Sequence, residues 1–550
     1  MTRNLLRPSP FPFRTIQGGR RGGGAPARPK ALGVTPLRMG PSELAAEMAE
    51  LYAMALLRDV PFDQLSSPHA RVRIDPQTEF SLHELLCELR SLAWFDRHAL
   101  PVGFAHTADT AHRALRKEEG HRRSARWNGD GQLTLSTLLR GALPGSALTS
   151  ERGHGAFLSR LMAPRVPDGA PPLAEALGAM PGNDRPLDDW AGWLAALTQA
   201  RTAWPHWPEQ ETASALPDLR ALAGHVHLHH PSQALFHAAL HLLAHGVPRD
   251  PHLGQPGLWT GPHILSLMAE VTSRSLRASR ELAAAPLRMA RPGVIAARLS
   301  MLHNRSEGRN EGAVPDAALE PELALVQAAL DELTQNAPNL LRWIGRLNRR
   351  DGAVGFGRAM PGPDWSDTRF RDNLMLPGTM VDNVPLMPAD GAGHAIVAGA
   401  CATLLKALFA THEADGQPVT LGTTAPRAVG PAGAAQNGNC PPRPLLGCEL
   451  DKLAGNVALG RNLAGGFWHA ETRASLRLGE RLALGLVQER LVAAARPASV
   501  SLDDFAGRRV VAGVVAGAGA AVLPSLTIDG CPRPICRAEE TGLRHLTAVV

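Results

Sequence analysis

The sequence has 550 residues, of which 44% are hydrophobic, so it is long enough for more than one domain and too apolar for a wholly disordered chain. Its formal net charge of +6 comes from residues 1–42, which hold 8 of the 57 lysines and arginines and no acidic residue, leaving 49 basic against 51 acidic side chains in the remainder. A near-neutral body argues against a nucleic-acid partner, and we expect residues 1–40 to form a basic disordered tail.

No targeting or membrane segment is visible in the sequence. The first 30 residues lack the apolar core of a secretory signal. The longest apolar run, residues 510–523, is too short to span a bilayer. We therefore expect no membrane span, and a cytoplasmic location by default.

Helical periodicity dominates the chain, and we predict an all-α fold with few or no strands. Leucine, methionine and alanine recur at helical spacing in the first helix, where Ser42 is expected to cap the N-terminus, and Asp451 is expected to cap the last one. The expected helices cover residues 41–58, 81–93, 188–200, 231–246, 263–285, 320–348 with a break at Pro338, and 451–496. Strand patterns are confined to residues 510–515 and 525–528.

These elements divide the chain into three parts after the tail. Residues 41–255 form an N-terminal helical half, and residues 256–500 form the helical bundle with the chemically informative motifs. Residues 501–550 are expected to pack on the bundles as a C-terminal segment. The long loop within residues 350–390 predicts a lid or a channel wall.

The histidines and cysteines raise the possibilities of a metal site and of disulfide bonds, but their spacing identifies neither a ligand set nor a cysteine pair. His237, His241 and His245 recur along one face of the helix expected at 231–246, and such a row could bind zinc or copper. Because no acid or cysteine completes a recognisable set, we assign no metal ligands. Cys401 lies on an apolar helix face as a small core residue, and the disulfide state stays open for four others: Cys440, Cys448, Cys531 and Cys536.

The most informative stretch runs from Pro388 to Phe409. A turn rich in glycine and proline leads through Gly393 and His394 into an apolar helix with many small residues. Such a turn binds anions by default, since the free N–H groups and the helix dipole point at the ligand. The same stretch could equally be a buried core helix with a glycine-rich entry.

Four motifs in a fixed order resemble the vanadium-dependent haloperoxidases of the algal and cyanobacterial bromoperoxidase type. They are L-Y-A-M-A-L-L-R-D-V-P-F (51–62), A-R-P (290–292), G-H-A-I-V-A-G-A-C-A-T-L-L-K-A-L-F (393–409) and N-V-A-L-G-R-N-L-A-G-G-F-W-H-A-E-T-R-A-S-L-R-L-G-E (456–480). The resemblance runs from about residue 40 to the C-terminus. It implies two packed four-helix bundles, assembly into homo-oligomers, and a site shared with the type 2 phosphatidic acid phosphatases.

The resemblance also implies a site for a tetrahedral oxyanion. Arg291 and Arg461 match the family's two arginines, and Gly393 and His394 match its glycine and its acid–base histidine. These residues would hold vanadate, an oxyanion that needs several cations and N–H donors around its oxygens. The implied activity is the peroxide-dependent oxidation of a halide, expected to be bromide, to hypohalous acid.

Four positions depart from the family pattern, and one of them is Met387, which stands where the family has a second histidine in the active-site loop. The lysine corresponds to Ala283 or Ala284, the serine to Ala392, and the axial histidine to Phe467. A hydrogen bond to a charged group contributes about 1.5–3 kcal/mol. Losing the lysine and serine contacts would therefore weaken oxyanion binding by about 10²–10⁴.

Two nearby residues could compensate for these losses: Arg280 for the lysine and His469 for the axial histidine. The sequence leaves three hypotheses open. The chain is a vanadate-dependent haloperoxidase, or a metal-independent member of the fold that binds an anionic substrate, or a non-catalytic structural relative. An active enzyme would have hydrogen peroxide and a halide as its partners.

Overall fold

A computed structural model describes the regions of the chain that carry the motifs above. The described residues are 37–103 (without 63, 68 and 97), 110–124, 216–254, 259–283, 289–306, 320–355, 373–377, 392–412, 445–494, 498–516, 522–532 and a few isolated positions between them. The basic tail and the helix expected at 188–200 lie outside them, as does most of the loop expected at 350–390.

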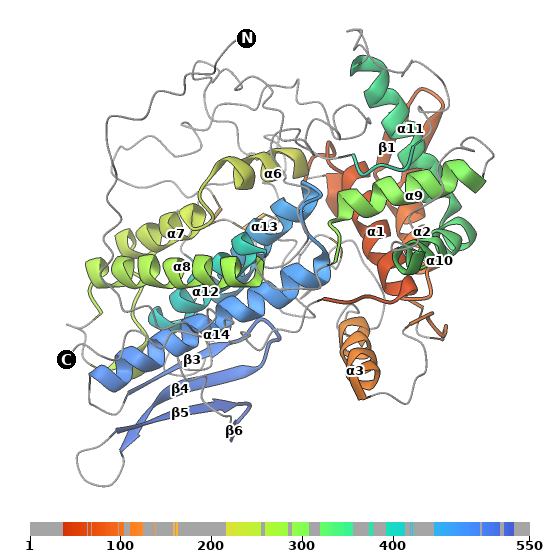
Figure 1. Cartoon of the computed structure of the whole chain (residues 1–550). Coiled ribbons are helices and arrows are strands. Elements are labelled where there is room, and N and C mark those ends of the chain that lie inside the picture. The colour runs from red at the N-terminus through yellow and green to blue at the C-terminus, as the bar shows by residue number, and fades with distance from the viewer. Residues whose placement is uncertain are drawn as a thin grey trace, which may run out of the picture.

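The helices form two groups, which lie side by side in Figure 1. In the larger group, α12 packs against α8, α13 and α14, and α6 and α7 cover the same assembly. Their bounds are α6 Leu219–Leu228, α7 Gln233–Ala244, α8 Gly261–Ala283, α12 Gly393–Leu408, α13 Leu446–Leu463 and α14 His469–Ala493.

The smaller group is built around α1 (Pro41–Leu56), which contacts α2, α10 and α11. Residues 42–56 of α1 are buried, including three glutamates, so the helix has no solvent-exposed face. The other helices of this group are α2 Leu82–Arg90, α9 Pro292–Ser306, α10 Glu320–Asn336 and α11 Pro338–Gly355. The hairpin of β1 Arg71–Asp75 and β2 Thr78–Ser81 packs beside α2 and α11, and α3 spans Thr110–Ser124.

The backbones of α12 and α14 touch, because each helix has a glycine at the crossing. A Cβ added to Gly399 would lie 2.3 Å from the carbonyl oxygen of Leu476, and one added to Gly479 would lie 2.1 Å from that of Ile396. Real Cβ atoms do not approach carbonyl oxygens so closely, so larger residues would push the helices apart. The small residues of α12 are therefore needed for packing.

A four-stranded antiparallel sheet packs on α14 in the order β3–β4–β5–β6 (Figure 1). Its strands are β3 Ala498–Asp503, β4 Arg509–Ala516, β5 Val522–Ile528 and the two-residue β6 Cys531–Pro532. The two strand patterns in the sequence correspond to β4 and β5. The expectation of a mainly helical fold with few strands is confirmed, and the sheet adds a small β-layer to it.

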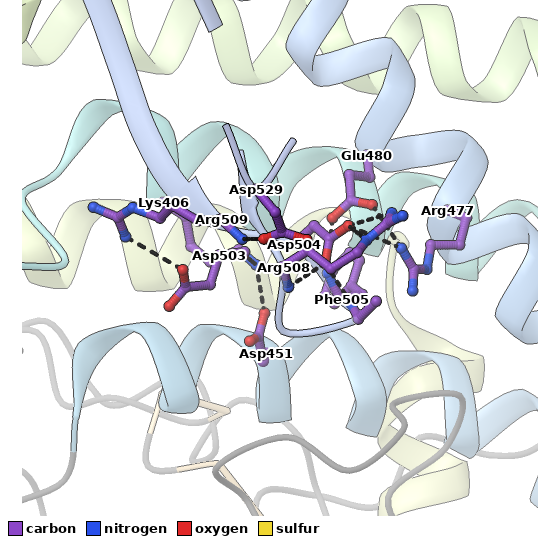
Figure 2. Close-up of polar contacts among 11 residues, drawn as sticks. Lys406, Asp451, Arg477, Glu480, Asp503, Asp504, Phe505, Arg508, Arg509 and Asp529 are labelled. Carbon is purple, nitrogen blue, oxygen red and sulfur yellow. Dashed lines mark hydrogen bonds and ion pairs between the residues drawn. The ribbon is translucent and has the colours of Figure 1, made fainter. Parts of the chain in front are cut away.

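Charged side chains anchor this sheet to the helices (Figure 2). Lys406 of α12 is 1% exposed, and its Nζ lies 2.7 Å from both Asp451 Oδ1 and the carbonyl oxygen of Asp503. In the β3–β4 turn, Asp504 accepts hydrogen bonds from Arg508 and from Arg477 of α14. Breaking a buried pair such as Lys406–Asp451 leaves an uncompensated charge, so these contacts fix the sheet on the bundle.

Three details of the predicted helices are wrong. Residues 451–496 belong to two helices, because Gly465 takes a φ of 70° and ends α13. Asp451 lies inside α13 and pairs with Lys406, so it caps no helix. Ser42 makes no capping bond either: its hydroxyl donates to Glu332 Oε2 and accepts from the Val102 N–H.

Three of the cysteines singled out earlier, Cys401, Cys448 and Cys531, are free thiols. Burial raises the pKa of the Cys401 thiol to about 12, which agrees with its assignment to the core. Cys440 and Cys536 lie outside the described residues. Among the helices that the structure describes, none is both long enough and apolar enough to cross a membrane.

The α12–α14 contact yields a direct test of packing. We expect Gly399→Ala to lower the free energy of unfolding by about 1–3 kcal/mol or more, because the new methyl group must displace the Leu476 carbonyl. Gly345→Ala in α11 is the matched control, since its added Cβ meets nothing within 4 Å. It should raise stability by up to about 1 kcal/mol through better helix propensity. Urea unfolding of both variants measures the difference, and equal effects would contradict the close-contact explanation.

Candidate functional site

The first turn of α12 provides the backbone of the candidate site. The helix begins at Gly393 with Ala392 as its N-cap, and Ala392 offers no side-chain bond to the first N–H groups. A Cβ added to Gly393 would lie 2.8 Å from the hydroxyl oxygen of Ser279 on α8. Glycine thus lets Ser279 approach closely, and Ser279 brings a hydroxyl to the turn where the sequence itself has alanine.

His394 is held in place by one hydrogen bond and has one buried nitrogen left over. Its ring hydrogen-bonds to the backbone of Val226 on α6, while Nε2 is buried and has no hydrogen-bond partner among the described residues. Burial, followed by the charge of Arg461, lowers the pKa of His394 to about 3. The imidazole is therefore neutral at physiological pH, and acidification below its ordinary pKa of 6.5 costs folding stability, since the unfolded chain takes up the proton first.

Arg461 in the last turn of α13 reaches the same place because α6 packs tightly on α13. A Cβ added to Gly460 would lie 2.7 Å from Val226, so glycine permits this approach. The Arg461 guanidinium donates from Nη1 to His227 Nδ1 over 2.6 Å, and its Nε is buried with no partner among the described residues. Burial, with a contribution from Arg291, lowers the pKa of Arg461 to about 10, so it stays charged at neutral pH.

Arg291 enters from the smaller helix group, immediately before α9. Its carbonyl accepts the N–H of Val294 and Ile295, and its guanidinium donates to the carbonyl oxygen of Gly466. Its side chain is 8% exposed, and burial lowers its pKa while Glu471 opposes that shift. The preceding residue is also fixed, because Trp468 Nε1 donates to the Ala290 carbonyl over 3.0 Å.

The ring of Phe467 lies close to both guanidinium groups. The Cζ of Arg291 is 4.5 Å from the centre of its ring, and the Cζ of Arg461 is 5.9 Å from it. The negative faces of an aromatic ring attract such cations, so Phe467 helps to hold both arginines in the interior. The position at which the family resemblance implies an axial histidine is thus filled by a hydrophobic ring.

The structure therefore brings together all four residues that the sequence singled out. The charge of Arg291 lowers the pKa of Arg461, and the charge of Arg461 lowers the pKa of His394. His394 and Gly393 share the first turn of α12. Two charged guanidiniums, a neutral imidazole and a helix N-terminus suit a small oxyanion, which accepts hydrogen bonds and needs positive charge in a low-dielectric interior.

The two compensating residues do not join this group. Arg280 is exposed on α8, and the neighbouring Ser279 faces Gly393 instead. His469 is 3% exposed and lies beside α1, where its backbone N–H donates to Glu47 Oε2 over 2.6 Å. The histidine row of α7 does not form a metal-binding group among the described residues either, and His245 Nδ1 contacts the carbonyl oxygen of His241.

Sequence reasoning missed two contributors, His227 and Ser279. His227 lies in the run H-V-H-L-H-H (225–230), whose spacing gives no sign that one of its histidines contacts an arginine far along the chain. Ser279 lies in an ordinary polar stretch of α8, and no local signal could distinguish it.

Comparisons with known proteins agree with the motifs. The chain is 26% identical over 528 aligned residues to vanadium-dependent bromoperoxidases of Corallina pilulifera and Corallina officinalis, covering 88% of this chain and 77% of theirs. A homohexameric vanadate-dependent bromoperoxidase of Ascophyllum nodosum shares the fold with a TM-score of 0.53 and 18% identity, over 89% of this chain and 73% of that one. No protein-family model matches the sequence.

Proposed function

We propose that this chain, a vanadium haloperoxidase-like protein by sequence and fold, binds a small tetrahedral oxyanion between Arg291, Arg461 and the first turn of α12. His394 is the group that exchanges a proton with the bound species. One observation carries the proposal: two buried nitrogens, Arg461 Nε and His394 Nε2, lack partners among the described residues. A protonated oxyanion in the pocket would accept a hydrogen bond from Arg461 Nε and donate one to His394 Nε2, and buried polar groups in native proteins are rarely left without a partner.

Vanadate is a small oxyanion whose negative charge suits this pocket, but position 467 lacks the nitrogen that would bind the metal. Arg291, Arg461, the Gly393 N–H and His394 would surround the oxygens, as they would surround phosphate or sulfate. The phenyl ring of Phe467 offers no nitrogen to a metal, and the structure directs His469 toward α1. When bound, vanadate would supply the activation of peroxide toward halide that the family resemblance implies.

The protein's own residues account for binding and for proton handling. The arginines hold the anion by charge, and Phe467 and the packing of α6 on α13 keep water from their guanidiniums. Because burial leaves His394 neutral and its N–H is used on the Val226 backbone, Nε2 can accept a hydrogen bond or a proton from a bound oxyanion. This set suits general acid–base work on an anionic substrate in the absence of a metal.

Haloperoxidase activity is the second candidate, and the comparisons favour it. The Corallina relatives are vanadium-dependent bromoperoxidases, and the similarity covers most of both chains. By analogy we infer an oxidoreductase ancestry with hydrogen peroxide and bromide as the substrates to assay. The Ascophyllum bromoperoxidase is a homohexamer, so we also propose that this chain forms a homo-oligomer.

Removal of Arg461 tests the oxyanion site. We expect Arg461→Ala to weaken phosphate or sulfate binding by about 10-fold or more, because a charge-assisted hydrogen bond contributes about 1.5–3 kcal/mol. Arg280→Ala, which removes an exposed arginine on α8, should leave the affinity unchanged. Isothermal titration calorimetry measures both variants. Equal affinity of Arg461→Ala and the wild type would exclude this site.

Proton coupling tests the role of His394. An anion beside the ring stabilises its charged form, so binding should raise the pKa of His394 from its free value of about 3 and take up protons. Sulfate, which does not itself titrate near neutral pH, should therefore bind more tightly as the pH falls from about 8 to 5. The neighbouring Arg461, His227 and His230 also face this ring.

The matched variant is His394→Gln, which should flatten the pH dependence of sulfate affinity. Sulfate titrations at several pH values give both profiles. An unchanged slope in His394→Gln would assign the proton uptake to the other histidines.

Position 467 tests the loss of the vanadate ligand. We expect the wild type to retain little vanadate after desalting and to oxidise bromide slowly. Phe467→His places an imidazole between Arg291 and Arg461 and should raise vanadate retention by about 10-fold or more. Phe467→Leu controls for the lost ring. Metal analysis and a peroxide-dependent bromination assay give the result, and strong wild-type turnover would instead establish the haloperoxidase.

A further inference from the structure

A second group of polar side chains lies on the other side of the segment that carries Phe467. Glu47 and Glu50 extend from α1, and His469 is the first residue of α14. All three are buried, with exposed fractions of 4%, 1% and 3%. One ligand atom from each residue lies within 4.8 Å of the ligand atoms of the other two.

We propose that Glu47, Glu50 and His469 bind a divalent cation of the zinc or manganese class, which joins α1 to the start of α14. Ligand atoms sit about 2.0–2.6 Å from such ions, so two ligands of one ion are separated by up to about 5 Å. The observed separations fall within that limit. Two carboxylates with one imidazole suit zinc or manganese better than calcium, which prefers oxygen ligands alone.

The orientation of Glu47 is consistent with a ligand. Its Oε2 accepts the backbone N–H of His469 over 2.6 Å, and its Oε1 accepts that of Ala470 over 3.1 Å. A carboxylate oxygen can accept an N–H and bind a cation through its second lone pair at the same time. The two N–H bonds hold the carboxylate in one orientation, as hydrogen bonds around metal sites commonly do.

The surroundings of this group are acidic. One turn earlier on α1, the buried Glu43 is matched by Arg122, whose Nη2 donates to Glu43 Oε2 over 2.6 Å. Glu47 and Glu50 add two further carboxylates to the same interior. A divalent ion would add positive charge beside these carboxylates.

This ion would have a structural role next to the oxyanion site. His469 follows Phe467 by two residues, and Trp468 between them is fully buried and bonded to Ala290. A cation at His469 would therefore fix the same short segment that carries Phe467. The proposal does not depend on the oxyanion proposal, because it involves none of its binding residues.

Metal content tests the proposal directly. The full-length protein, purified without chelators and given zinc chloride or manganese chloride, should retain about one metal per chain after desalting. Glu50→Gln and His469→Gln should each lower the metal affinity by about 10-fold or more, and the metal should raise the wild-type unfolding temperature. Glu43→Gln, on the same helix but paired with Arg122, should bind metal as the wild type does.

Two results would overturn the proposal: wild-type protein without bound metal and without a thermal shift, or metal retained equally in Glu50→Gln and His469→Gln. If those variants fail to fold, X-ray absorption of zinc bound to the wild type decides instead. A single imidazole among oxygen ligands supports this site. Two or more imidazoles would place the ion at the histidine-rich α6 and α7, and would overturn it.

Discussion

The contact between α12 and α14 constrains the rest of the molecule. Gly399 and Gly479 let the two backbones touch, and this leaves little freedom in how the helices slide or rotate against each other. The first turn of α12 begins less than two turns before Gly399, so the position of Gly393 and His394 follows from the same contact. The packing that stabilises the bundle thereby also positions the candidate site, and a change at either glycine would affect both.

Around that turn, each charged group depends on another element for its position. Phe467 supports both guanidiniums, α6 contributes a histidine that accepts from Arg461, and α8 contributes the hydroxyl beside Gly393. Positive charge in such an interior is costly unless an anion or an aromatic ring accompanies it. The pocket therefore combines strong attraction for an oxyanion with a histidine that burial keeps neutral.

Charge is distributed unequally along the segment from Gly466 to Glu471. The guanidiniums of Arg291 and Arg461 lie near the ring of Phe467, while the carboxylates of α1 gather at His469. This short connection between α13 and α14 thus lies beside both the proposed oxyanion site and the proposed cation site. Each of these sites combines residues of both helix groups, so a bound ion at either one would tie the groups together.

The sequence by itself determined much of the fold. Periodic leucines and alanines identified α1, α2, α7, α8, α10 and α11, and two runs of β-branched residues identified β4 and β5, because local periodicity is set by the geometry of each element. Helix ends were less predictable, as at Asp451, since the competing partner, Lys406, lies on another helix. The motif order also indicated the similarity to vanadium-dependent bromoperoxidases and singled out the four candidate residues Arg291, Gly393, His394 and Arg461.

Only the tertiary structure decided how those residues work. Nothing local places His227 against Arg461, Ser279 against Gly393 or His469 against Glu47, because each pair is separated by more than a hundred residues. The burial of three glutamates on α1 could not be read from the sequence either, since an amphipathic pattern normally leaves its polar face in water. Residue type and spacing fix which groups are present, whereas packing fixes their neighbours, and the neighbours set charge, pKa and ligand preference.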